Sequence, residues 1–571
     1  MPALSILIWL PLACGLAGAL LGALGGPASG GARAPDGGES AHAAGGGARA
    51  RWSAPGALAL LGALGALGLA IYYIAEFNPG GGLQDVTDTV WIAALGIHYK
   101  LAITGLNVFL VGLTTLLFAA AVLASNLRSE APPVDRPRLY YFNFMLAESA
   151  VLGAFLAQDL ALFVAFFDLM LIPFYFLIGM DPTRPGPDRV KATIKLVIYT
   201  LVGSLLMLAG AIATGVLAAQ QNGGHVTFVL SALHALPLST GSQEWIFLFF
   251  AAAFLVKMPA FPLHGWMPDG YRAMPIEVLM VFSGVLSKVG AYGFLAIVLP
   301  LFPQAAVHFQ TLLLLIGLLS IVYGSLQAFS QTDARLILGY SSVAQLGFIT
   351  VGIFALDRQG AQGALLQMVN HGLVMGPILL IVALLARRAG GSEDIRDMGG
   401  IAFRAPVLAS LALIVTLATL AMPGSSNFVG EFLILLGLFK AKLVIAIVAF
   451  SGVVMASVYA LRLFIGAFHN RVGAKVESHE ISLRDSLVLV PLVLVILFFA
   501  IYPQLALHRS EGSTKTAVAR VQAVEHARLP ESVLVGRVRR SAGTATGTGT
   551  GEAVAPAGAA SQANPEGREE P

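Results

Sequence analysis

The feature that most restricts the fold of this chain is a succession of apolar blocks. Each is about 20 residues long, the length that a helix needs to cross the hydrocarbon core of a bilayer. The blocks do not alternate between apolar and polar residues, as the strands of a membrane barrel would. Only 11% of the residues are charged, against about 25% in soluble proteins. We therefore predict an all-α polytopic membrane protein with about 14 transmembrane helices, near 3–24, 55–76, 103–124, 140–157, 160–180, 192–218, 245–262, 276–300, 309–329, 336–355, 362–386, 404–438, 443–468 and 485–503.

The loops between these blocks differ in their content of Lys and Arg. If the N-terminus lies outside, the inner loops hold 19 such residues and the outer loops hold 4. Because Lys and Arg accumulate in cytoplasmic loops, both termini are predicted on the outer side of the membrane. The first block has no basic flank and is long for a signal peptide, so we interpret it as the first span.

Some kinds of chemistry are excluded by the residues present. The chain has one cysteine, Cys14, which cannot form an intrachain disulfide or hold an iron–sulfur cluster, since a cluster needs about four thiolates. No Gly-rich nucleotide-binding loop occurs between a strand and a helix. We therefore expect no cofactor and no metal on this chain. Any linked redox reaction is expected on a partner.

Two segments have low complexity, residues 25–51 and residues 541–571, and neither suggests chemistry. Between the last span and the second of these, residues 514–540 are predicted to form one amphipathic helix on the outer surface.

Two apolar blocks are interrupted in a similar way. In the first, Lys257 is followed by Pro259 and Pro262, and in the second a Pro-Gly pair and small polar residues precede Glu431. Proline breaks helices, and a matching pair of broken spans is typical of transporters built from inverted repeats. The predicted organisation has helices 1–3 at 1–138, inverted five-helix repeats at 139–302 (spans 4–8) and 303–470 (spans 9–13), a final helix at 471–505, and a largely disordered extramembrane tail at 506–571.

Ionisable residues inside the apolar blocks are the candidates for function. A charge at the centre of a bilayer costs roughly 2.5–3.5 kcal/mol on insertion scales, and such residues usually mark ion or proton paths. Acids and bases alternate along the chain, so a row of them can pass a proton if waters bridge them. The candidate relay consists of Asp168, Lys257, Lys288, His371 and Glu431, with possible accessory roles for Glu148, Lys195, His264 and Gln345.

Each candidate also has a purely structural interpretation. Lys257 could extend its ammonium group to the headgroups, although the break places it deep in the span. His371 could donate a hydrogen bond between helices, Asp168 could pair with a lysine for structural reasons, and Glu148 remains open between the two interpretations.

Six motifs carry a family resemblance. The chain resembles the antiporter-like membrane subunits of respiratory complex I, NADH-quinone oxidoreductase, and within them the subunit M (chain 4) branch. The resemblance covers residues from about 85 to 505, and its motifs are "DLALFVAFFDLMLIPFYFLIG", "KMPAFPLHGWMPDGY", "GVLSKVGAYG", "ARLILGYSSVAQLGF", "LLQMVNHGL" and "PGSSNFVGEFLIL". Glu431 supports this branch, because other members usually have lysine there.

The resemblance implies the role of each relay residue. Asp168 and Lys257 would be the gating ion pair of the first half, and Lys288 would connect toward the middle. His371 would continue a hydrated axis, and Glu431 would end the second half. Proton pumping would be driven by quinone reduction on partner subunits that hold NAD, FMN, iron–sulfur clusters and quinone, and the two sibling antiporter-like subunits would be neighbours in the membrane.

Two positions depart from the family pattern. The family has glutamate where this chain has Asp168, so the shorter side chain puts direct contact with Lys257 in doubt. The family often has histidine where this chain has Gln345, which cannot titrate but can orient water.

Other functions remain open at this point. A cation/proton antiporter subunit of the Mrp type or a hydrogenase-linked relative would use the same kind of chain. A structural scaffold is a third possibility, although a scaffold would have no use for five buried ionisable groups.

Overall fold

The computed structural model describes residues 4–24, 53–127, 136–180 and 186–528. The low-complexity segments 25–51 and 541–571 lie outside these ranges. In the described part, 12 helical segments are long and apolar enough to cross a membrane. Two further segments, near 240–273 and 406–441, are discontinuous, and counting them would bring the number of crossings to the predicted 14.

The helices follow one another along the chain with few other elements between them. They are α1 (Leu4–Leu24), α2 (Ala54–Glu76), α3 (Val108–Leu127), α4 (Pro137–Leu156), α5 (Leu160–Leu169), α6 (Leu171–Gly179), α7 (Gly186–Ala219), α8 (Leu230–Ala235), α9 (Thr240–Lys257), α10 (Met267–Ala273), α11 (Ile276–Val281), α12 (Ser287–Gly293), α13 (Leu299–Leu301), α14 (Pro303–His308), α15 (Gln310–Ser330), α16 (Ala334–Phe354), α17 (Arg358–Arg388), α18 (Pro406–Thr419), α19 (Ser426–Ala441), α20 (Leu443–Phe468), α21 (Leu483–Ile501) and α22 (Gln504–Arg528).

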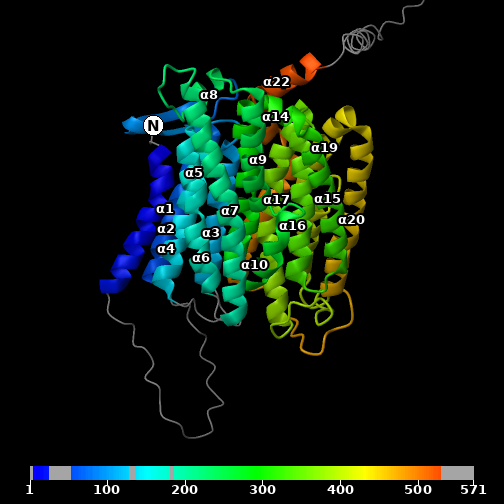
Figure 1. The fold of residues 1–571 in the computed structure, drawn as a ribbon. Helices are drawn as coiled ribbons and strands as arrows, with labels where there is room; N and C mark the ends of the chain where they lie inside the picture. The colour runs from blue at the N-terminus through cyan, green and yellow to red at the C-terminus, as the bar shows by residue number, and fades with distance from the viewer. Residues whose placement is uncertain (1–3, 25–52, 128–135, 181–185, 529–571) are drawn as a thin grey trace, which may run out of the picture. The chain divides into compact units, whose positions relative to one another are not determined.

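Short helical turns of other kinds complete these spans. The elements η1 (Ala93–Leu95) and η2 (Leu263–Trp266) are 3-10 turns, and η3 (Phe282–Leu286) and η4 (Phe294–Val298) are π-helical. Figure 1 shows the long helices side by side, with α8, α14 and α22 at one end of the bundle and α10 toward the other. We call these the α22 end and the α10 end.

The structure corrects the all-α prediction at one place. Strands β1 (Gln84–Ile92) and β2 (Ile97–Ile103) form an antiparallel hairpin between α2 and α3. Asp88 lies 2.8 Å from both Lys100 and His98. The Lys100 hydrogen bond, helped by that of His98, holds the pKa of Asp88 below its usual value. The pattern of 20-residue apolar blocks does not reveal such a hairpin, because its two strands are only 9 and 7 residues long.

The two predicted interruptions are confirmed. Helix α9 ends at Lys257, and the segment with Pro259 and Pro262 leads through η2 into the short α10. Helix α18 ends at Thr419, and α19 begins only at Ser426. In the second break Gly424 has a φ of 93°, a conformation that side chains with a Cβ rarely adopt. Both breaks therefore occur where the sequence places proline beside small residues.

Helix α22 differs from the predicted tail. It begins at Gln504, ten residues before the predicted helix at 514–540, and residues after 528 lie outside the described ranges. Its first part packs against the bundle: the Gly105 amide donates to Ser513 Oγ at 3.0 Å, and Gln362 Nε2 donates to the Leu507 carbonyl at 2.9 Å. The region directly after 505 is thus an ordered helix rather than a loose tail.

Candidate functional site

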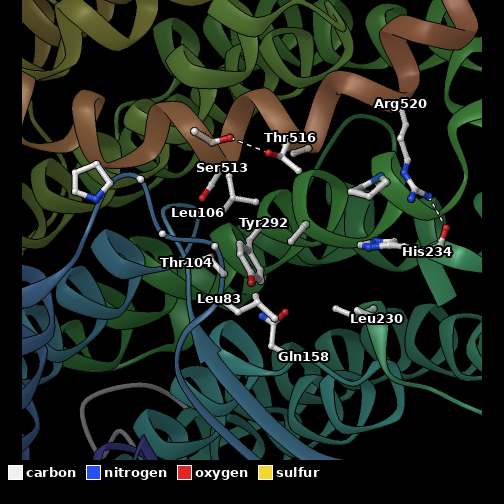
Figure 2. Close-up of a pocket in the computed structure, with 18 residues that line it drawn as sticks. Leu83, Thr104, Leu106, Gln158, Leu230, His234, Tyr292, Ser513, Thr516 and Arg520 are labelled. Atoms are coloured by element: carbon white, nitrogen blue, oxygen red, sulfur yellow. Dashed lines mark hydrogen bonds between the residues drawn. The ribbon is translucent and has the colours of Figure 1, made fainter. Parts of the chain in front are cut away.

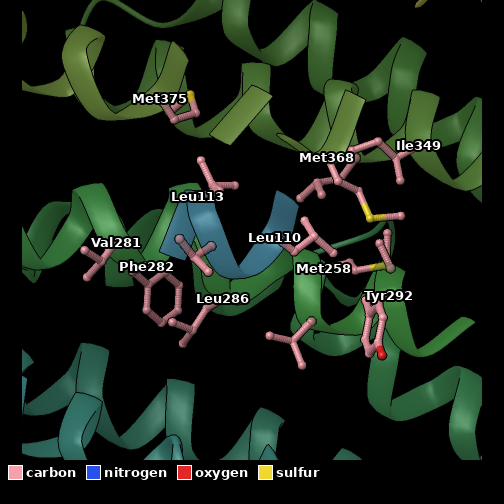
Figure 3. Close-up of a cluster of buried hydrophobic side chains, with 14 of the residues drawn as sticks. Leu110, Leu113, Met258, Val281, Phe282, Leu286, Tyr292, Ile349, Met368 and Met375 are labelled. Carbon is pink, nitrogen blue, oxygen red and sulfur yellow. The ribbon is translucent and has the colours of Figure 1, made fainter. Parts of the chain in front are cut away.

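Lys288 lies in the buried core of the bundle. Its side chain has 0% exposure, and Figure 3 shows part of the surrounding cluster, with Leu110 and Leu113 of α3 near Leu286 and Phe282. Lys288 Nζ donates to the Ser283 carbonyl at 2.6 Å and to Ser287 Oγ at 3.2 Å. The lysine is therefore held by polar atoms of its own helix.

The helix around Lys288 is irregular on both sides. Seven residues of α12 separate the π-helical turns η3 and η4. Such turns are rare and are frequently found at functional sites. Here the Ser283 carbonyl in η3 accepts a hydrogen bond from Lys288 Nζ.

Asp168 and Lys257 lie near each other without direct contact. Asp168 accepts a hydrogen bond from the Ser204 hydroxyl of α7, and Lys257 Nζ lies 4.5 Å from the centroid of the Phe167 ring. No ion-pair contact joins the two groups in this part of the structure, although they interact electrostatically. The geometry thus agrees with the expectation that the shorter aspartate side chain does not contact Lys257 directly. Ser204 was not anticipated from the sequence.

His371 lies beside Lys288 because two helices approach closely. A Cβ on Gly372 would lie 2.5 Å from the Gly284 carbonyl oxygen, so only glycine permits this approach of α17 to η3. His371 is 2% exposed and interacts electrostatically with Lys288, and neither ring nitrogen has a hydrogen-bond partner among the described residues. The structural interpretation, a hydrogen bond between helices, is not observed for this residue.

Glu431 forms the centre of a polar cluster on α16, α17 and α19. Gln345 Nε2 donates to Glu431 Oε1 at 2.8 Å, and Gln367 Nε2 donates to Gln345 Oε1 at 2.8 Å and to Glu431 Oε1 at 3.3 Å. Asn370 Nδ2 donates to the Ser426 carbonyl at 2.6 Å. Gln345 was predicted near the relay, whereas Gln367 and Asn370 were missed.

The remaining accessory candidates lie apart from one another. Glu148 of α4 is fully buried, and neither of its oxygens accepts a hydrogen bond within the described ranges of the chain; it interacts electrostatically with Cys14 of α1. Lys195 pairs with Asp269 at 2.8 Å near the α10 end. His264 is 8% exposed and packs against Tyr323, with 4.8 Å between the two ring centroids. Among the described residues, none of the three forms a hydrogen bond or an ion pair with a relay residue, so their accessory roles stay predictions.

A cavity of about 550 Å³ opens at the α22 end. Figure 2 shows Tyr292 between Thr104 and Gln158, with His234 and Arg520 at the far side. Tyr292 follows Lys288 by four residues, about 6 Å along a helix axis. The cavity thus approaches the central lysine from one end of the bundle.

His234 in the wall of this cavity is neutral at physiological pH. Burial, with a smaller contribution from the Arg520 charge, lowers the pKa of His234 to about 4. Arg520 Nη1 donates to the His234 carbonyl at 2.7 Å, so this contact joins α22 to α8.

Comparisons with known proteins agree with this architecture. Residues 157–457 match the family described as NADH:quinone oxidoreductase/Mrp antiporter, TM. NADH-quinone oxidoreductase subunit M of Rhodobacter capsulatus is 36% identical over 448 residues, which are 76% of this chain and 85% of the relative. Subunit M of Escherichia coli K12 is 37% identical over 435 residues, 75% of this chain and 84% of the relative.

Solved structures resemble this chain over most of its length. A chain of respiratory complex I from Thermus thermophilus with bound NADH superposes with a TM-score of 0.76 at 29% identity, covering 90% of this chain and 99% of that one. A chain of the Mrp complex from Dietzia sp. DQ12-45-1b has a TM-score of 0.74 at 19% identity, covering 91% and 100%. The second similarity concerns the fold alone.

Proposed function

Because the chain belongs to the NADH-quinone oxidoreductase subunit M family, we propose that it moves protons across the membrane through its buried row of ionisable groups. The proposed order is Asp168, Lys257, Lys288, His371 and Glu431. The observation that carries this proposal is the proximity of Lys288 to His371 inside the buried core, where the part of the chain that the structure describes offers the imidazole no hydrogen-bond partner. Burial of such groups is costly, and a proton path gives a reason for it.

Charge coupling explains how the row can act in sequence. Lys288 and His371 interact electrostatically, and two positive charges at short range in a medium of low dielectric repel strongly. A proton that arrives at Lys288 therefore favours departure of a proton from His371 toward Glu431. Asp168 and Lys257 provide a gate, because a change in the distance between their charged groups alters the electrostatic potential at Lys288.

The driving energy comes from elsewhere in the complex. We propose that other membrane-arm subunits, among them the two sibling antiporter-like subunits, lie beside this chain. The NAD, FMN, iron–sulfur clusters and quinone would be bound by partner subunits, in keeping with the single cysteine of this chain. Quinone reduction there would reach the relay as a change in local charge.

The orientation and the internal repeats belong to the same proposal. From the bias of Lys and Arg in the loops, we propose that the α22 end and both termini lie on the outer side of a bacterial plasma membrane. The breaks after Lys257 and before Glu431 support two inverted repeats, at 139–302 and 303–470, each containing one discontinuous span.

An antiporter subunit of the Mrp type is the second candidate, supported by the shared fold. The higher identity to subunit M relatives, 36–37% against 19%, favours the complex I assignment. Sodium-driven proton exchange in vesicles, with no redox subunits attached to the purified protein, would support the antiporter instead.

Purification from native membranes in mild detergent tests the assignment. We expect flavin, iron–sulfur and quinone-binding subunits to accompany the chain, together with NADH–quinone activity. In sealed vesicles, Lys257→Ala and Glu431→Gln should leave the complex assembled and reduce proton pumping coupled to NADH oxidation. Lys442→Ala, at an exposed lysine beyond α19, is the matched control and should pump normally. Wild-type pumping in both relay variants would contradict the proposal.

A further inference from the structure

Helices α17 and α19 touch backbone to backbone beside Glu431. A Cβ on Gly363 would lie 2.8 Å from the Gly430 carbonyl oxygen, and a Cβ on Gly430 would lie 2.5 Å from Gln367 Oε1. Small residues permit such close packing of membrane helices. The close approach brings the buried Gln367 side chain, with 0% exposure, against the Glu431 carboxylate.

The two glutamine amides form a directed chain of hydrogen bonds. An ionised carboxylate only accepts hydrogen bonds, so the amide next to it must present its NH₂ group. Gln345 does this at 2.8 Å, and its own oxygen in turn accepts from Gln367 at 2.8 Å. Gln367 Nε2 also reaches the same carboxylate oxygen at 3.3 Å. Both amides therefore point their N–H groups at Oε1.

The second carboxylate oxygen is in a different situation. Glu431 Oε2 is buried and accepts no hydrogen bond from the part of the chain that the structure describes. Other buried polar atoms without a protein partner lie on the same helices: Asn370 Oδ1 and both His371 ring nitrogens on α17, and the Asn427 side chain on α19. Buried polar atoms of this kind usually bind water, and Gln367 and His371, four residues apart, share a face of α17.

We propose that Gln367 is a positioning residue for Glu431: together with Gln345 it holds Oε1 as a hydrogen-bonded acceptor and leaves Oε2 as the oxygen that gains and loses the proton. This inference rests on the proposed function. When Glu431 is protonated, the O–H bond is on Oε2 and the C=O bond is on Oε1, where the amides donate. When the proton leaves Oε2, the same donors face the ionised carboxylate.

The carbonyl stretch of protonated Glu431 tests this assignment directly. In redox-induced infrared difference spectra of the intact complex, the Glu431 band is the carboxyl band that disappears in Glu431→Gln. Gln367→Met removes the amide donor with little change in side-chain length, so we expect the band to move to higher wavenumber and proton pumping per NADH to fall severalfold. Gln362→Met, the same substitution on α17 outside the cluster, should leave band and pumping unchanged.

The outcomes distinguish the positioning role of Gln367 from the proposed proton relay. An unmoved Glu431 band in Gln367→Met would overturn the positioning role and leave the proposed function intact. This holds even if pumping is lost, because a loss of pumping with an unmoved band is a structural effect of the substitution. If no carboxyl band disappears in Glu431→Gln, Glu431 does not change protonation, and the proposed relay fails at that residue. Should Gln367→Met not assemble, Gln345→Met removes the neighbouring donor and must move the same band in the same direction.

Discussion

The contact between Gly372 and Gly284 is a narrow point between the helices that carry His371 and Lys288. In a Gly372→Ala variant the new Cβ would lie 2.5 Å from the Gly284 carbonyl oxygen and 2.5 Å from Leu113 Cδ2. Carbon and carbonyl oxygen approach to about 3.3 Å at closest in favourable contacts, so α17 must move by roughly 0.8 Å. Overpacking of a buried core costs typically about 1–3 kcal/mol.

The displacement should affect proton transfer more than assembly. A misplacement of about 1 Å can slow a reaction step roughly 100-fold, and the shift here separates His371 from Lys288. We expect Gly372→Ala to assemble with a lower thermal stability and to lose most of its proton pumping. The assay combines thermal unfolding of the purified complex with NADH-driven acidification of sealed vesicles.

A matched substitution controls for the change from glycine to alanine itself. A Cβ on Gly68 of α2 would meet nothing within 4 Å, so Gly68→Ala should be neutral or slightly stabilising, since alanine favours helix by about 1 kcal/mol over glycine. If Gly372→Ala matched Gly68→Ala in both stability and pumping, the close approach would have no role in the relay and the reasoning would be refuted.

Three further predictions concern other parts of the molecule. Asp168→Glu should pump as well as the parent or better, because the longer side chain can reach Lys257, whereas Asp168→Asn should pump less; vesicle acidification compares the two. In the folded protein His234 stays neutral down to its pKa of about 4, whereas in the unfolded chain it takes up a proton below about pH 6.5. The stability of the region near α8 therefore falls as the pH drops from about 6.5 toward 4. Hydrogen exchange measured at pH 5 and at pH 7.5 should show this loss in the parent but not in His234→Gln. Arg335→Met breaks a buried ion pair with Glu393, 2.5 Å long, at a cost of about 3–5 kcal/mol, and should lower the yield of assembled complex, measured by native gel; a normal yield would show that the pair is dispensable.

The broad architecture follows from the sequence because long apolar blocks and proline have few alternatives in a membrane. The breaks beside Pro259 and Pro423 were predictable for this reason, as were the buried ionisable residues, whose rarity in apolar blocks makes them conspicuous. The helix α22 was placed too late because its buried face consists of small residues such as Ala506, Ser510 and Thr514, which give a weak amphipathic signal.

The contacts of the site were less predictable. Ser204, Gln367 and Asn370 are neutral polar residues of kinds common in membrane helices, so nothing in the sequence distinguished them from others. One signal was present and unused: Gly372 directly follows His371, and Gly430 directly precedes Glu431. Glycine beside a buried ionisable residue indicates a close helix contact. One of these contacts brings His371 beside Lys288, and the other brings Gln367 against Glu431.

The most direct test of the relay is the number of protons pumped per NADH oxidised by complexes that carry Lys288→Met. Lys288 is fully buried, and methionine has a similar length with no charge, so assembly should survive. The relay predicts that the ratio falls while the complex remains assembled. An unchanged ratio at an unchanged rate of NADH oxidation would contradict it, because protons would then cross without the central lysine.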